Sequence, residues 1–465
     1  MSQARSKSQD PASVDEARQF LAVHSDVEAA QIFITDPSGV PRGKSIARSE
    51  IEALYGTGRN VAGSIVGLDI TGADVDATGL VWDVGDADKL CRPVSGTLVR
   101  APWLARPTAQ LMLTMYELDG RAAAADPRHA LVRAVERFAA LGLTPVLACE
   151  IEFYLVREGA RNAGGKGLEP VCRPGAGGRH KIDSYSLDRL DDLAGLFDEL
   201  FSAARTQGLP AETLMSEYAP GQFEVTLHHR PDALRAVDEA ILFKRLIKGI
   251  ATKHGVTATF MAKPFVAHAG SGLHLHLSLE DEVGRNAFAD AAPEGSALLR
   301  QAIAGMQKTM AESVAIFAPN GNSYRRFRPS SYAPIAPTWG VNNRSVSLRV
   351  PAGPPASRHI EHRVAGADAN LYLAAATVLG AAHVGIQGKL DPGPPIVGNG
   401  YNQADRASLP MTWHAALEQA AQSEFLRDAL GPEFLKVFLA IKRQECERFS
   451  AEVTDLDYDW YLRTT

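Results

Sequence analysis

Several short segments of the sequence place ionisable side chains at every second position. The segment CEIEFYLV carries Glu150 and Glu152, and SGLHLHLSL carries His274, His276 and Ser278. The same arrangement occurs in EYAPGQFEVTL with Glu217 and Glu224, in SVSLRV with Arg349, and in HIEHRV with Glu361 and Arg363. Because successive side chains of a β-strand point to opposite faces, each strand would present charged groups on one face and apolar groups on the other.

The composition of these faces decides between two interpretations. Solvent-exposed faces of antiparallel sheets also alternate with apolar faces, and a single pair such as Glu150 and Glu152 is weak evidence for a site. Ordinary solvent faces favour Lys, Thr, Ser and Gln, however, whereas these faces are almost confined to Glu, His and Arg. The pattern therefore indicates a shared site rather than plain sheet surface.

The residue types point to one kind of chemistry. Carboxylates with one imidazole are hard, oxygen-rich ligands that suit Mg²⁺ or Mn²⁺ better than a zinc thiolate site would. Neighbouring arginines supply planar, bidentate partners for phosphate or carboxylate groups. Together they predict a divalent-metal site that handles the phosphates of ATP and an acidic co-substrate. Catalysis there would be mostly positioning and charge neutralisation.

The elements that position these residues fall into two regions. A short helix is expected over residues 13–24, and AAQIFITD and PSGVPRGKS predict two strands around a tight turn. The GKS tripeptide is no phosphate loop, because the required glycine is Ser38. Further strand-like runs, SIVGLDI and GTLVRAPW, make the region up to about residue 115 a small β-rich domain.

A second domain is expected to begin near Asp126, where amphipathic helices followed by apolar strands replace the first pattern. Residues 158–180 are dense in glycine, which predicts a surface loop or partly disordered insertion rather than a packed element. The C-terminal third is expected to be mostly helical.

Composition excludes several classes of protein. The 465 residues allow about two or three domains, and a net charge of −6 gives no reason to expect nucleic acid or an anionic membrane as partner. The apolar run over residues 371–386 is too short to span a membrane. Neither a secretory signal nor a disulfide or zinc framework is indicated, so a reducing cytoplasm is expected. The four cysteines are Cys91, Cys149, Cys172 and Cys446.

Taken together, these segments resemble the class I-like glutamine synthetase family over nearly the whole chain. The resemblance also rests on ATFMAKPF followed by GSGLHLHLS, which contains Gly270, on NSYRRF with Arg326, and on NNRSVSLRVP with Arg344. It implies an α+β fold with a small β-grasp-like N-terminal domain at residues 14–115. The catalytic domain would follow at residues 122–465, built on a curved antiparallel sheet.

The resemblance also implies a role for each residue. Two or three Mg²⁺ or Mn²⁺ ions would be held per active site, one by Glu152, Glu217 and Glu224 and another by Glu150, His274 and Glu361. Glutamate would lie against Gly270, Arg326 and Arg363, the phosphates against Arg344 and Arg349, and the nucleotide near His276 and Ser278. Glu217, Arg344 and Glu361 are the expected catalytic residues.

The implied reaction begins with attack of the glutamate side-chain carboxylate on the γ-phosphate of ATP. Metal ions and arginines neutralise the phosphate charge, and an uncharged amine then opens the γ-glutamyl phosphate. An alkylammonium, with a pKa near the value of about 10.4 for lysine, must first lose a proton. The family implies a homo-oligomer, a dodecamer of two stacked hexameric rings, with active sites between subunits. Each site is completed by the neighbour's N-terminal domain.

Two departures from the family pattern concern the ammonium site. The aspartate of the usual D-G-S-S loop has no counterpart, since the segment reads VAGS from Val61, and Tyr332 replaces the glutamate six residues after Arg326. Both changes remove negative charge. The chain thus resembles the γ-glutamyl-amine ligase branch, and within it the γ-glutamylputrescine and polyamine synthetases. The segments GLDITG, VGDAD, EHRVAGADAN and EVTDLDYDWYL also carry this likeness.

Three positions bear on substrate binding. Tyr332 and Trp339 either line the amine entrance, where an aromatic face attracts an alkylammonium, or pack the loop. His359 stands where many relatives carry an arginine near the nucleotide phosphates, and Arg358 is a candidate to compensate. The surroundings of Tyr401 do not indicate regulatory adenylylation.

Three alternatives remain to be separated. The first is a glutamine synthetase that secures ammonium with other groups. The second is a sensor or scaffold without catalysis, and the third is a guanidino kinase with a related catalytic domain. The last lacks support because the N-terminal segments match the synthetase arrangement. Retention of all the expected metal ligands argues against the second.

Overall fold

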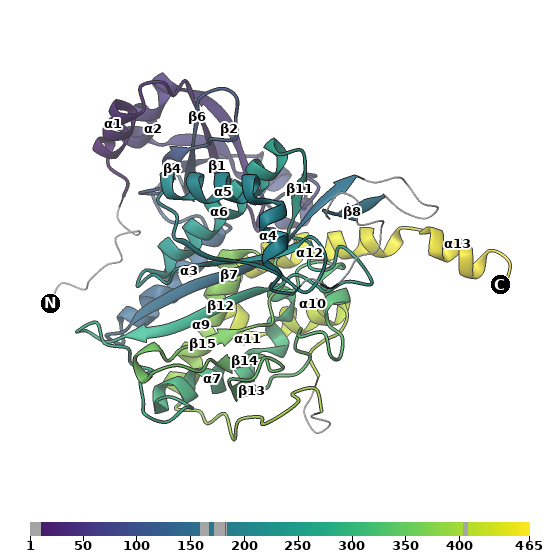
Figure 1. The fold of residues 1–465 in the computed structure, drawn as a ribbon. Helices are drawn as coiled ribbons and strands as arrows, with labels where there is room; N and C mark the ends of the chain where they lie inside the picture. The colour runs from purple at the N-terminus through teal and green to yellow at the C-terminus, as the bar shows by residue number, and fades with distance from the viewer. Residues whose placement is uncertain (1–10, 159–166, 172–181, 183, 403–407) are drawn as a thin grey trace.

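Two β-sheets organise the chain in a computed structural model that describes residues 11–158, 167–171, 182, 184–402 and 408–465 (Figure 1). The N-terminal sheet has the order β2-β1-β6-β4-β3, with β5 paired to β6. Its parallel pair is β1 and β6, and the other pairs are antiparallel. The strands are β1 Ala29–Thr35, β2 Pro41–Ala47, β3 Arg59–Ala62, β4 Asp88–Pro93, β5 Val99–Arg100 and β6 Thr108–Tyr116.

The larger sheet has the order β13-β14-β15-β12-β7-β10-β9, and β8 and β11 both pair with β7. All its pairs are antiparallel except β13 with β14. The strands are β7 Thr144–Glu158, β8 Leu168–Pro170, β9 Ala211–Ser216, β10 Gln222–Leu227, β11 Thr257–Thr259, β12 Leu273–Glu280, β13 Trp339–Val341, β14 Leu348–Val350 and β15 Ile360–His362. The predicted α+β class with two unequal sheets is confirmed.

Helices pack around both sheets. Those of the N-terminal region are α1 Val14–Val23 and α2 Ile51–Thr57. The others are α3 Pro127–Ala139, α4 Leu187–Asp192, α5 Ala194–Thr206, α6 Ala233–Lys253, α7 Ala297–Thr309, α8 Val314–Phe317, α9 Leu371–Gln387, α10 Trp413–Gln422, α11 Glu424–Leu430, α12 Pro432–Ala451 and α13 Asp455–Tyr461. Helices predominate from α9 onward, as expected, but the earlier part of the C-terminal third also carries the strands β13, β14 and β15.

The sequence explains where two of these helices begin. Asp126 caps α3 by accepting a hydrogen bond from the backbone N–H of Arg128, and Pro127 fits the first turn. Asn370 caps α9 in the same way. Nearly all of α9 is buried, which accounts for its apolar sequence as core packing. In the described part of the chain, no helix is long and apolar enough to cross a membrane.

The larger sheet has one apolar and one charged face. The alternating apolar residues Ile151, Phe153 and Leu155 of β7 are fully buried. Phe153 contacts Phe223 of β10, which in turn contacts Phe197 of α5. Helices α5 and α6 pack together against this side. The period of two seen in the sequence thus separates a packed face from a face that is free to carry chemistry.

Several local expectations are corrected. SIVGLDI is not a strand, because Gly63–Val66 is a short 3₁₀ helix and the buried carboxylate of Asp69 turns the chain by accepting from the N–H groups of Thr71 and Ala73. GTLVRAPW contributes only the two residues of β5. Most of the glycine-rich stretch lies outside the described residues, but Leu168–Pro170 forms β8 against β7.

The described cysteines agree with the sequence: Cys91, Cys149 and Cys446 are free and buried, and Cys172 lies outside the described residues. The division into domains at residues 14–115 and 122–465 stays a prediction.

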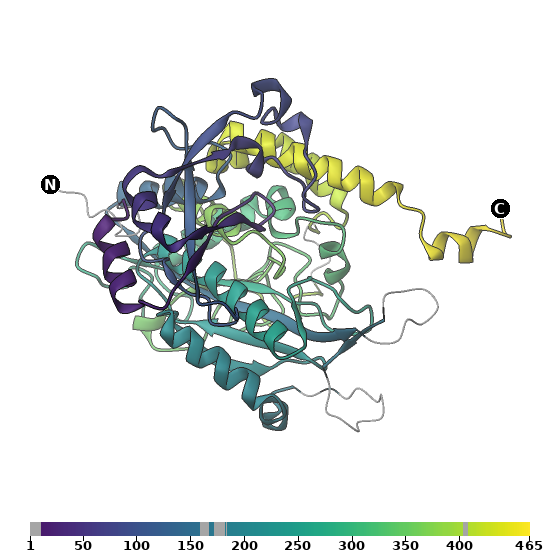
Figure 2. The same ribbon diagram turned by 90° about the horizontal axis from the view of Figure 1, so that it is seen from above.

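Helix α12 joins the C-terminal region to the N-terminal sheet. Figure 2 shows it running beside the N-terminal strands, and its Val437 and Ile441 belong to the apolar core of that sheet. The buried ammonium of Lys442 donates to Ser38 Oγ at 2.9 Å and to the Glu445 carboxylate at 2.8 Å. Glu445 also accepts from the backbone N–H of Ile70 at 2.8 Å. These contacts join segments about 400 residues apart.

Replacement Lys442→Ala is expected to destabilise the protein strongly, because it leaves Glu445 buried without its cation. Removing one partner of a buried pair costs about 3–5 kcal/mol. For cooperative unfolding of 465 residues this corresponds to a fall in Tm of about 3–5 °C. Thermal unfolding of the full chain measures the effect. The matched control is Arg18→Ala, which removes an exposed ion pair to Glu52 and should change Tm little. Equal shifts in Tm for both variants would contradict the role of Lys442 in joining α12 to the N-terminal sheet.

Candidate active site

The charged face of the larger sheet brings the sequence-predicted carboxylates together. Strand register sets Glu224 of β10 opposite Glu152 of β7, and His274 of β12 opposite Glu150 of β7. His274 Nδ1 lies 2.7 Å from Glu150 Oε1. Glu217 stands at the end of β9, just before the turn into β10, as its position in EYAPGQFEVTL predicts. Cross-strand neighbours thus place four glutamates and one imidazole in a single cluster.

Glu361 of β15 completes this face from the other side. It pairs in register with His276 of β12 and with Arg349 of β14. Its carboxylate accepts from Arg349 at 2.8 Å and from Arg363, and it lies 3.7 Å from His274 Nδ1. Glu361 is 1% exposed. A buried anion with two arginines and two histidines around it is well neutralised.

The ligand atoms form three overlapping groups, each within 4.8 Å. The group Glu152, Glu217 and Glu224 is the set predicted for one ion. For the predicted set Glu150, His274 and Glu361, the geometry gives two groups instead, Glu150 with His276 and Glu361, and Glu150 with Glu224 and His274. Carboxylate oxygens with an imidazole fit Mg²⁺ or Mn²⁺. The role of each residue in holding an ion remains a prediction.

Burial and mutual repulsion make the ionised form of several acids in this cluster unfavourable. Burial, with Glu217 as the nearest like charge, raises the pKa of Glu152 to about 7. Burial and Glu150 raise the pKa of Glu224 to about 12, and burial also raises the pKa of Glu217. Each of these groups would have to lose its proton to act as a ligand, so cation binding would reverse these shifts.

Two other acids remain ionised. Burial opposes the charge of Glu150, but His274 and His276 outweigh it and hold the pKa of Glu150 well below the ordinary value. Burial likewise opposes the charge of Glu361, and Arg363 with His274 brings its pKa to about 2. The cluster therefore has one half balanced by the protein's own cations and one half that lacks a counter-charge.

Glycines allow the loop before β12 to approach the cluster closely. The backbone N–H of Gly272 donates to Glu152 Oε2 at 2.8 Å. A Cβ at Gly272 would lie 2.8 Å from the Arg326 guanidinium and 2.9 Å from the His274 ring. A Cβ at Gly270 would lie 2.7 Å from the carbonyl oxygen of Ala262 and 2.8 Å from Arg326. Gly270 and Arg326, which are predicted to hold the substrate glutamate, thus lie beside the loop that bonds Glu152, and the charge of Arg326 acts on Glu152.

The arginines are positioned by backbone and carboxylate acceptors. Arg326 is buried and donates to the carbonyl oxygens of Val364 and Arg363 at 2.8 and 3.3 Å. The Nε atoms of Arg349 and Arg363 are buried, and neither makes a hydrogen bond within the described part of the chain. Preset guanidinium groups with spare N–H donors suit an anionic substrate.

Arg344 and Tyr332 line a cavity of about 540 Å³. The charge of Arg344 also acts on Glu217, where it partly offsets the rise in pKa that burial causes. Arg344 is exposed, and Tyr332 is 64% exposed with a backbone φ of 58°. Glu294, Pro395, Ile396 and Val397 line the same cavity. Ser278 is half-buried on β12, two residues after His276 and on the same face. Tyr332 therefore lines a cavity, and its place at an amine entrance stays a prediction.

Trp339 and Arg358 are both buried. Trp339 is 1% exposed, packs in the apolar core and donates its indole N–H to the Gly393 carbonyl oxygen, which agrees with the packing alternative and not with an entrance. Arg358 donates through Nη1 to the Gly353 carbonyl oxygen, and its compensation for His359 stays a prediction. His359 lies against the ring of His276, with the ring centroids 5.2 Å apart.

The sequence reasoning missed Gln222. Its buried side chain donates to Glu152 Oε2 at 3.2 Å and to the Gly270 carbonyl oxygen at 3.0 Å, and so ties β10 to the glycine loop. The signal was present, because Gln222 precedes Glu224 by two residues and shares its face. Glu294 was missed as well, and nothing in its local sequence marks it.

Comparison with known proteins gives one consistent result. The glutamine synthetase catalytic domain family matches residues 124–461. The γ-glutamylputrescine synthetase PuuA of Escherichia coli (strain K12) is 38% identical over 451 residues, 96% of this chain and 94% of the relative. The glutamate-isopropylamine ligase of a Pseudomonas species is 33% identical over 460 residues, 96% and 97% of the two chains. The solved structure of a GmaS/ADP complex has a TM-score of 0.82 at 26% identity and covers 97% of this chain and 100% of that one.

Replacement Glu224→Gln is expected to stabilise the protein when a chelator is present. The raised pKa of Glu224 means that the folded state holds a proton that the unfolded state loses above about pH 4.5, so stability falls as pH rises from there. The isosteric amide of Gln cannot ionise, so it removes the cost of keeping Glu224 protonated. The decrease in stability with rising pH should therefore be smaller in the variant. Thermal unfolding between pH 5 and pH 8 in chelator measures both effects.

The same variant should respond less to divalent cations. At a Mn²⁺ concentration about 100 times Kd, binding adds about 2.7 kcal/mol to the stability of the wild type, and loss of a ligand should remove most of that gain. The control is Glu452→Gln, at an exposed position at the end of α12, which should keep the full Mn²⁺ response. A wild-type Mn²⁺ shift retained by Glu224→Gln would exclude this residue as a ligand.

Proposed function

The chain belongs to the glutamine synthetase family, and we propose that it is an ATP-dependent ligase that joins the γ-carboxylate of L-glutamate to the amine of a polyamine or another alkylamine. The observation that supports this most directly is the carboxylate cluster on the charged face of the sheet, with arginines on the adjoining strands. Such a face binds cations and, through them and the arginines, polyphosphate and carboxylate groups.

In this proposal the carboxylate cluster holds two or three Mg²⁺ or Mn²⁺ ions. Glu152, Glu217 and Glu224 would hold one ion, and Glu150, His274 and Glu361 another, with His276 close enough to share the second. The ions would supply neutralisation of the charge on the transferred phosphoryl group. When the ions bind, the acids with raised pKa values would release their protons to solvent, and the ions would neutralise the resulting carboxylates.

The arginines would bind and orient the anionic groups. Arg349 and Arg363 are held by Glu361 and keep their buried Nε donors for a substrate oxygen. Arg326, with Gly270 beside it, would hold the glutamate substrate, and Arg344 would reach the phosphates from its exposed loop. His276 and Ser278 would contact the nucleotide. Preset donors of this kind stabilise a transition state without reorganisation at the moment of reaction.

The preference for an alkylamine over ammonia rests on the acids missing at two positions. Val61 and Tyr332 carry no charge where ammonium-using relatives place carboxylates, so a small cation has less to hold it. Tyr332 is exposed at the mouth of a cavity lined in part by Ile396, Val397 and Pro395. An aromatic face attracts an alkylammonium by about 0.5–1 kcal/mol at an exposed site, and apolar walls favour its carbon chain.

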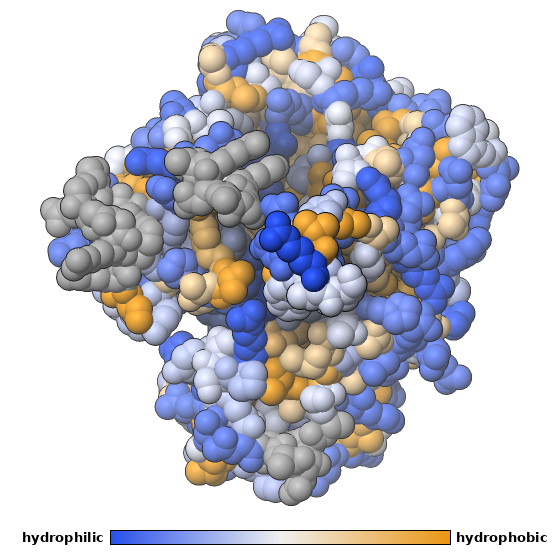
Figure 3. Space-filling model, turned by 90° about the vertical axis from the view of Figure 1, so that its right-hand side faces the viewer, coloured by the Kyte–Doolittle hydropathy of each residue, from blue (hydrophilic) through white to orange (hydrophobic). Residues whose placement is uncertain are grey.

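Assembly into a ring-shaped homo-oligomer, a dodecamer with active sites between subunits, is part of the proposal. Val61 lies on β3 in the N-terminal sheet and not in the carboxylate cluster of its own chain, as expected if the neighbour's N-terminal region completes each site. Figure 3 views the side from which the C-terminal segment projects, where apolar residues are exposed among polar ones. Leu456, Tyr458, Trp460 and Leu462 of this segment are each more than half exposed, and burial of such a surface in a second subunit would be favourable.

A panel of amines tests the proposal directly. Phosphate release from ATP, glutamate and Mg²⁺ should be fastest with putrescine, spermidine or another alkylamine among ammonia, methylamine, ethanolamine, putrescine and spermidine. A clear preference for ammonia would identify a glutamine synthetase instead, and no release with any amine would favour the sensor or scaffold.

Tyr332→Glu makes the test specific to the amine pocket. Restoring the acid should shift the preference toward ammonia, since a carboxylate favours a small cation at this position. Tyr332→Gln is the control, because it removes the ring without adding charge and should weaken alkylamine use without improving ammonia. If Tyr332→Glu leaves the ratio of the kcat/KM value for the alkylamine to that for ammonia unchanged, Tyr332 does not set specificity.

A further inference from the structure

A second cavity, of about 460 Å³, lies between the N-terminal sheet and helix α6. Its walls come from the turn after β1, from Trp103 and Leu104, from one side of α6, and from the start of α9. Helix α6 packs on the apolar side of the larger sheet, so this cavity is behind the sheet, away from the carboxylate cluster. Its volume is in the range of sites for small molecules.

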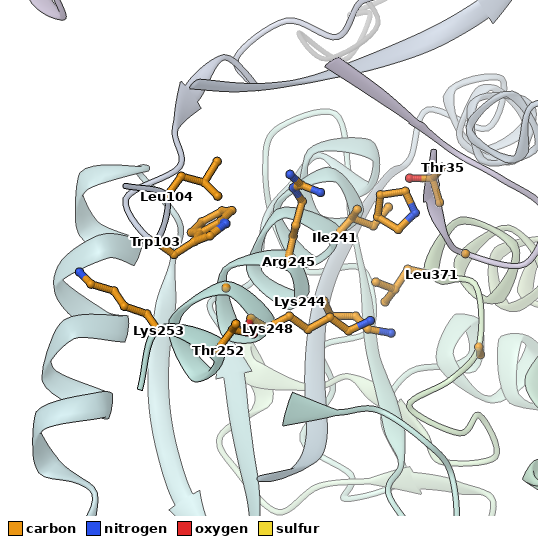
Figure 4. A pocket seen from close by; sticks show the side chains of 14 residues that line it. Thr35, Trp103, Leu104, Ile241, Lys244, Arg245, Lys248, Thr252, Lys253 and Leu371 are labelled. Carbon is orange, nitrogen blue, oxygen red and sulfur yellow. The ribbon is translucent and has the colours of Figure 1, made fainter. Parts of the chain in front are cut away.

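Cationic side chains dominate one wall of this cavity. Lys244, Arg245 and Lys248 are on adjacent positions of α6, and Figure 4 shows Lys244 and Lys248 extending in the same direction across the cavity. No Asp or Glu is among the described residues that line it. Lys253, about one turn farther along, differs because its ammonium lies 2.5 Å from the Glu199 carboxylate, which neutralises it. Three cations of α6 thus face a shared space without an acid in its lining.

The contacts of these cations position them without cancelling their charge. Lys244 donates to the Ala367 carbonyl oxygen at 2.7 Å and lies 4.6 Å from the ring centroid of Phe260. Arg245 donates to the amide oxygens of Gln110 and Gln31. Backbone and amide oxygens are neutral acceptors. Burial and the neighbouring Lys248 lower the pKa of Lys244 to about 7, although the charge of Asp368 acts in the opposite direction.

Buried donors beside the cations also lack acceptors. Thr35 is 4% exposed and lines the cavity, and its hydroxyl makes no hydrogen bond to any residue that the structure describes. The Nε2 donor of Gln110, next to Arg245, is likewise buried and unpaired within the described residues. Buried polar groups in native proteins nearly always have a partner. Orphaned donors next to uncompensated cations indicate a missing anionic acceptor.

The rest of the lining includes aromatic and apolar groups. Trp103 lies directly on Gly249 of α6, where a Cβ would come within 2.3 Å of the indole ring. Leu104, Ile241 and Leu371 add apolar surface. The cavity therefore combines cationic and apolar lining, which suits an organic molecule that carries a charged group.

We propose that this cavity is a binding site for a small organic molecule bearing a phosphate group. Phosphate, rather than a single carboxylate, matches the converging donors: a phosphate ester has three terminal oxygens and a charge near −2 at neutral pH, and lysine ammonium groups are common phosphate partners. The site is separate from the one proposed for ATP, since none of its residues belongs to the charged face of the sheet. It goes beyond the proposed ligase activity and does not depend on it.

Pyridoxal 5′-phosphate is a suitable probe, because it carries both a phosphate and an aldehyde. The aldehyde forms an imine with a neutral lysine amine and releases water, and borohydride then reduces the imine to a stable secondary amine. At pH 7.5 the lowered pKa leaves much of Lys244 neutral. Peptide mapping by mass spectrometry of the full chain, in chelator, should find the label concentrated on Lys244 or Lys248. Inorganic phosphate should protect both lysines.

Matched variants test whether the cationic lining and Thr35 bind the phosphate. The measured quantity is the phosphate concentration at which labelling of Lys244 falls to half. Lys248→Met should raise this concentration about tenfold, as expected for the loss of one charge-assisted hydrogen bond. Thr35→Val should raise it several-fold. Lys253→Met, on the same helix but already paired, should leave it unchanged. Equal labelling by pyridoxal without the phosphate, absence of protection, or identical behaviour of Lys248→Met and Lys253→Met would overturn the proposal.

Discussion

The site depends on one constraint: several glutamate carboxylates must lie close together on a buried sheet face, where like charges repel and water is scarce. Burial alone favours protonation of such groups, and the high pKa values of Glu152 and Glu224 show that the protein supplies too little positive charge for them. Glu361 shows the opposite outcome, because Arg349 and Arg363 neutralise it. Divalent cations would supply the charge that the proposed function requires at this cluster.

The rest of the fold keeps this face rigid. The aromatic residues Phe153 and Phe223 lock strands β7 and β10 from behind, while Gln222 and the N–H of Gly272 hold Glu152 from the front. Helix α12, through Lys442 and Glu445, fastens the N-terminal sheet to the same body. Like charges also gather behind the sheet, at Lys244 and Lys248, with the opposite sign. In both places we propose a ligand of opposite charge.

Much of this could be read from the sequence, for a definite reason. A β-strand has a side-chain period of two, so the faces of Glu150 and Glu152 or His274 and His276 are fixed as soon as the strand is recognised. Register between strands is not local, and that His276 lies opposite Glu361 had to come from the fold. The two alternatives for Trp339 could not be separated from the sequence, because loop sequence does not reveal burial. The cations of α6 resemble an ordinary exposed helix face, and only the packing of Trp103 against Gly249 closes the cavity around them.

A crystal structure of the protein grown with Mn²⁺, with anomalous scattering used to locate the ions, tests the central claim most directly. The account predicts at least two Mn²⁺ peaks in the carboxylate cluster. One should be coordinated by Glu152, Glu217 and Glu224, and the other by Glu150 and Glu361 with His274 or His276, at distances of about 2.0–2.3 Å. A cluster without anomalous signal at saturating Mn²⁺, or with ions bound only elsewhere on the surface, would contradict it.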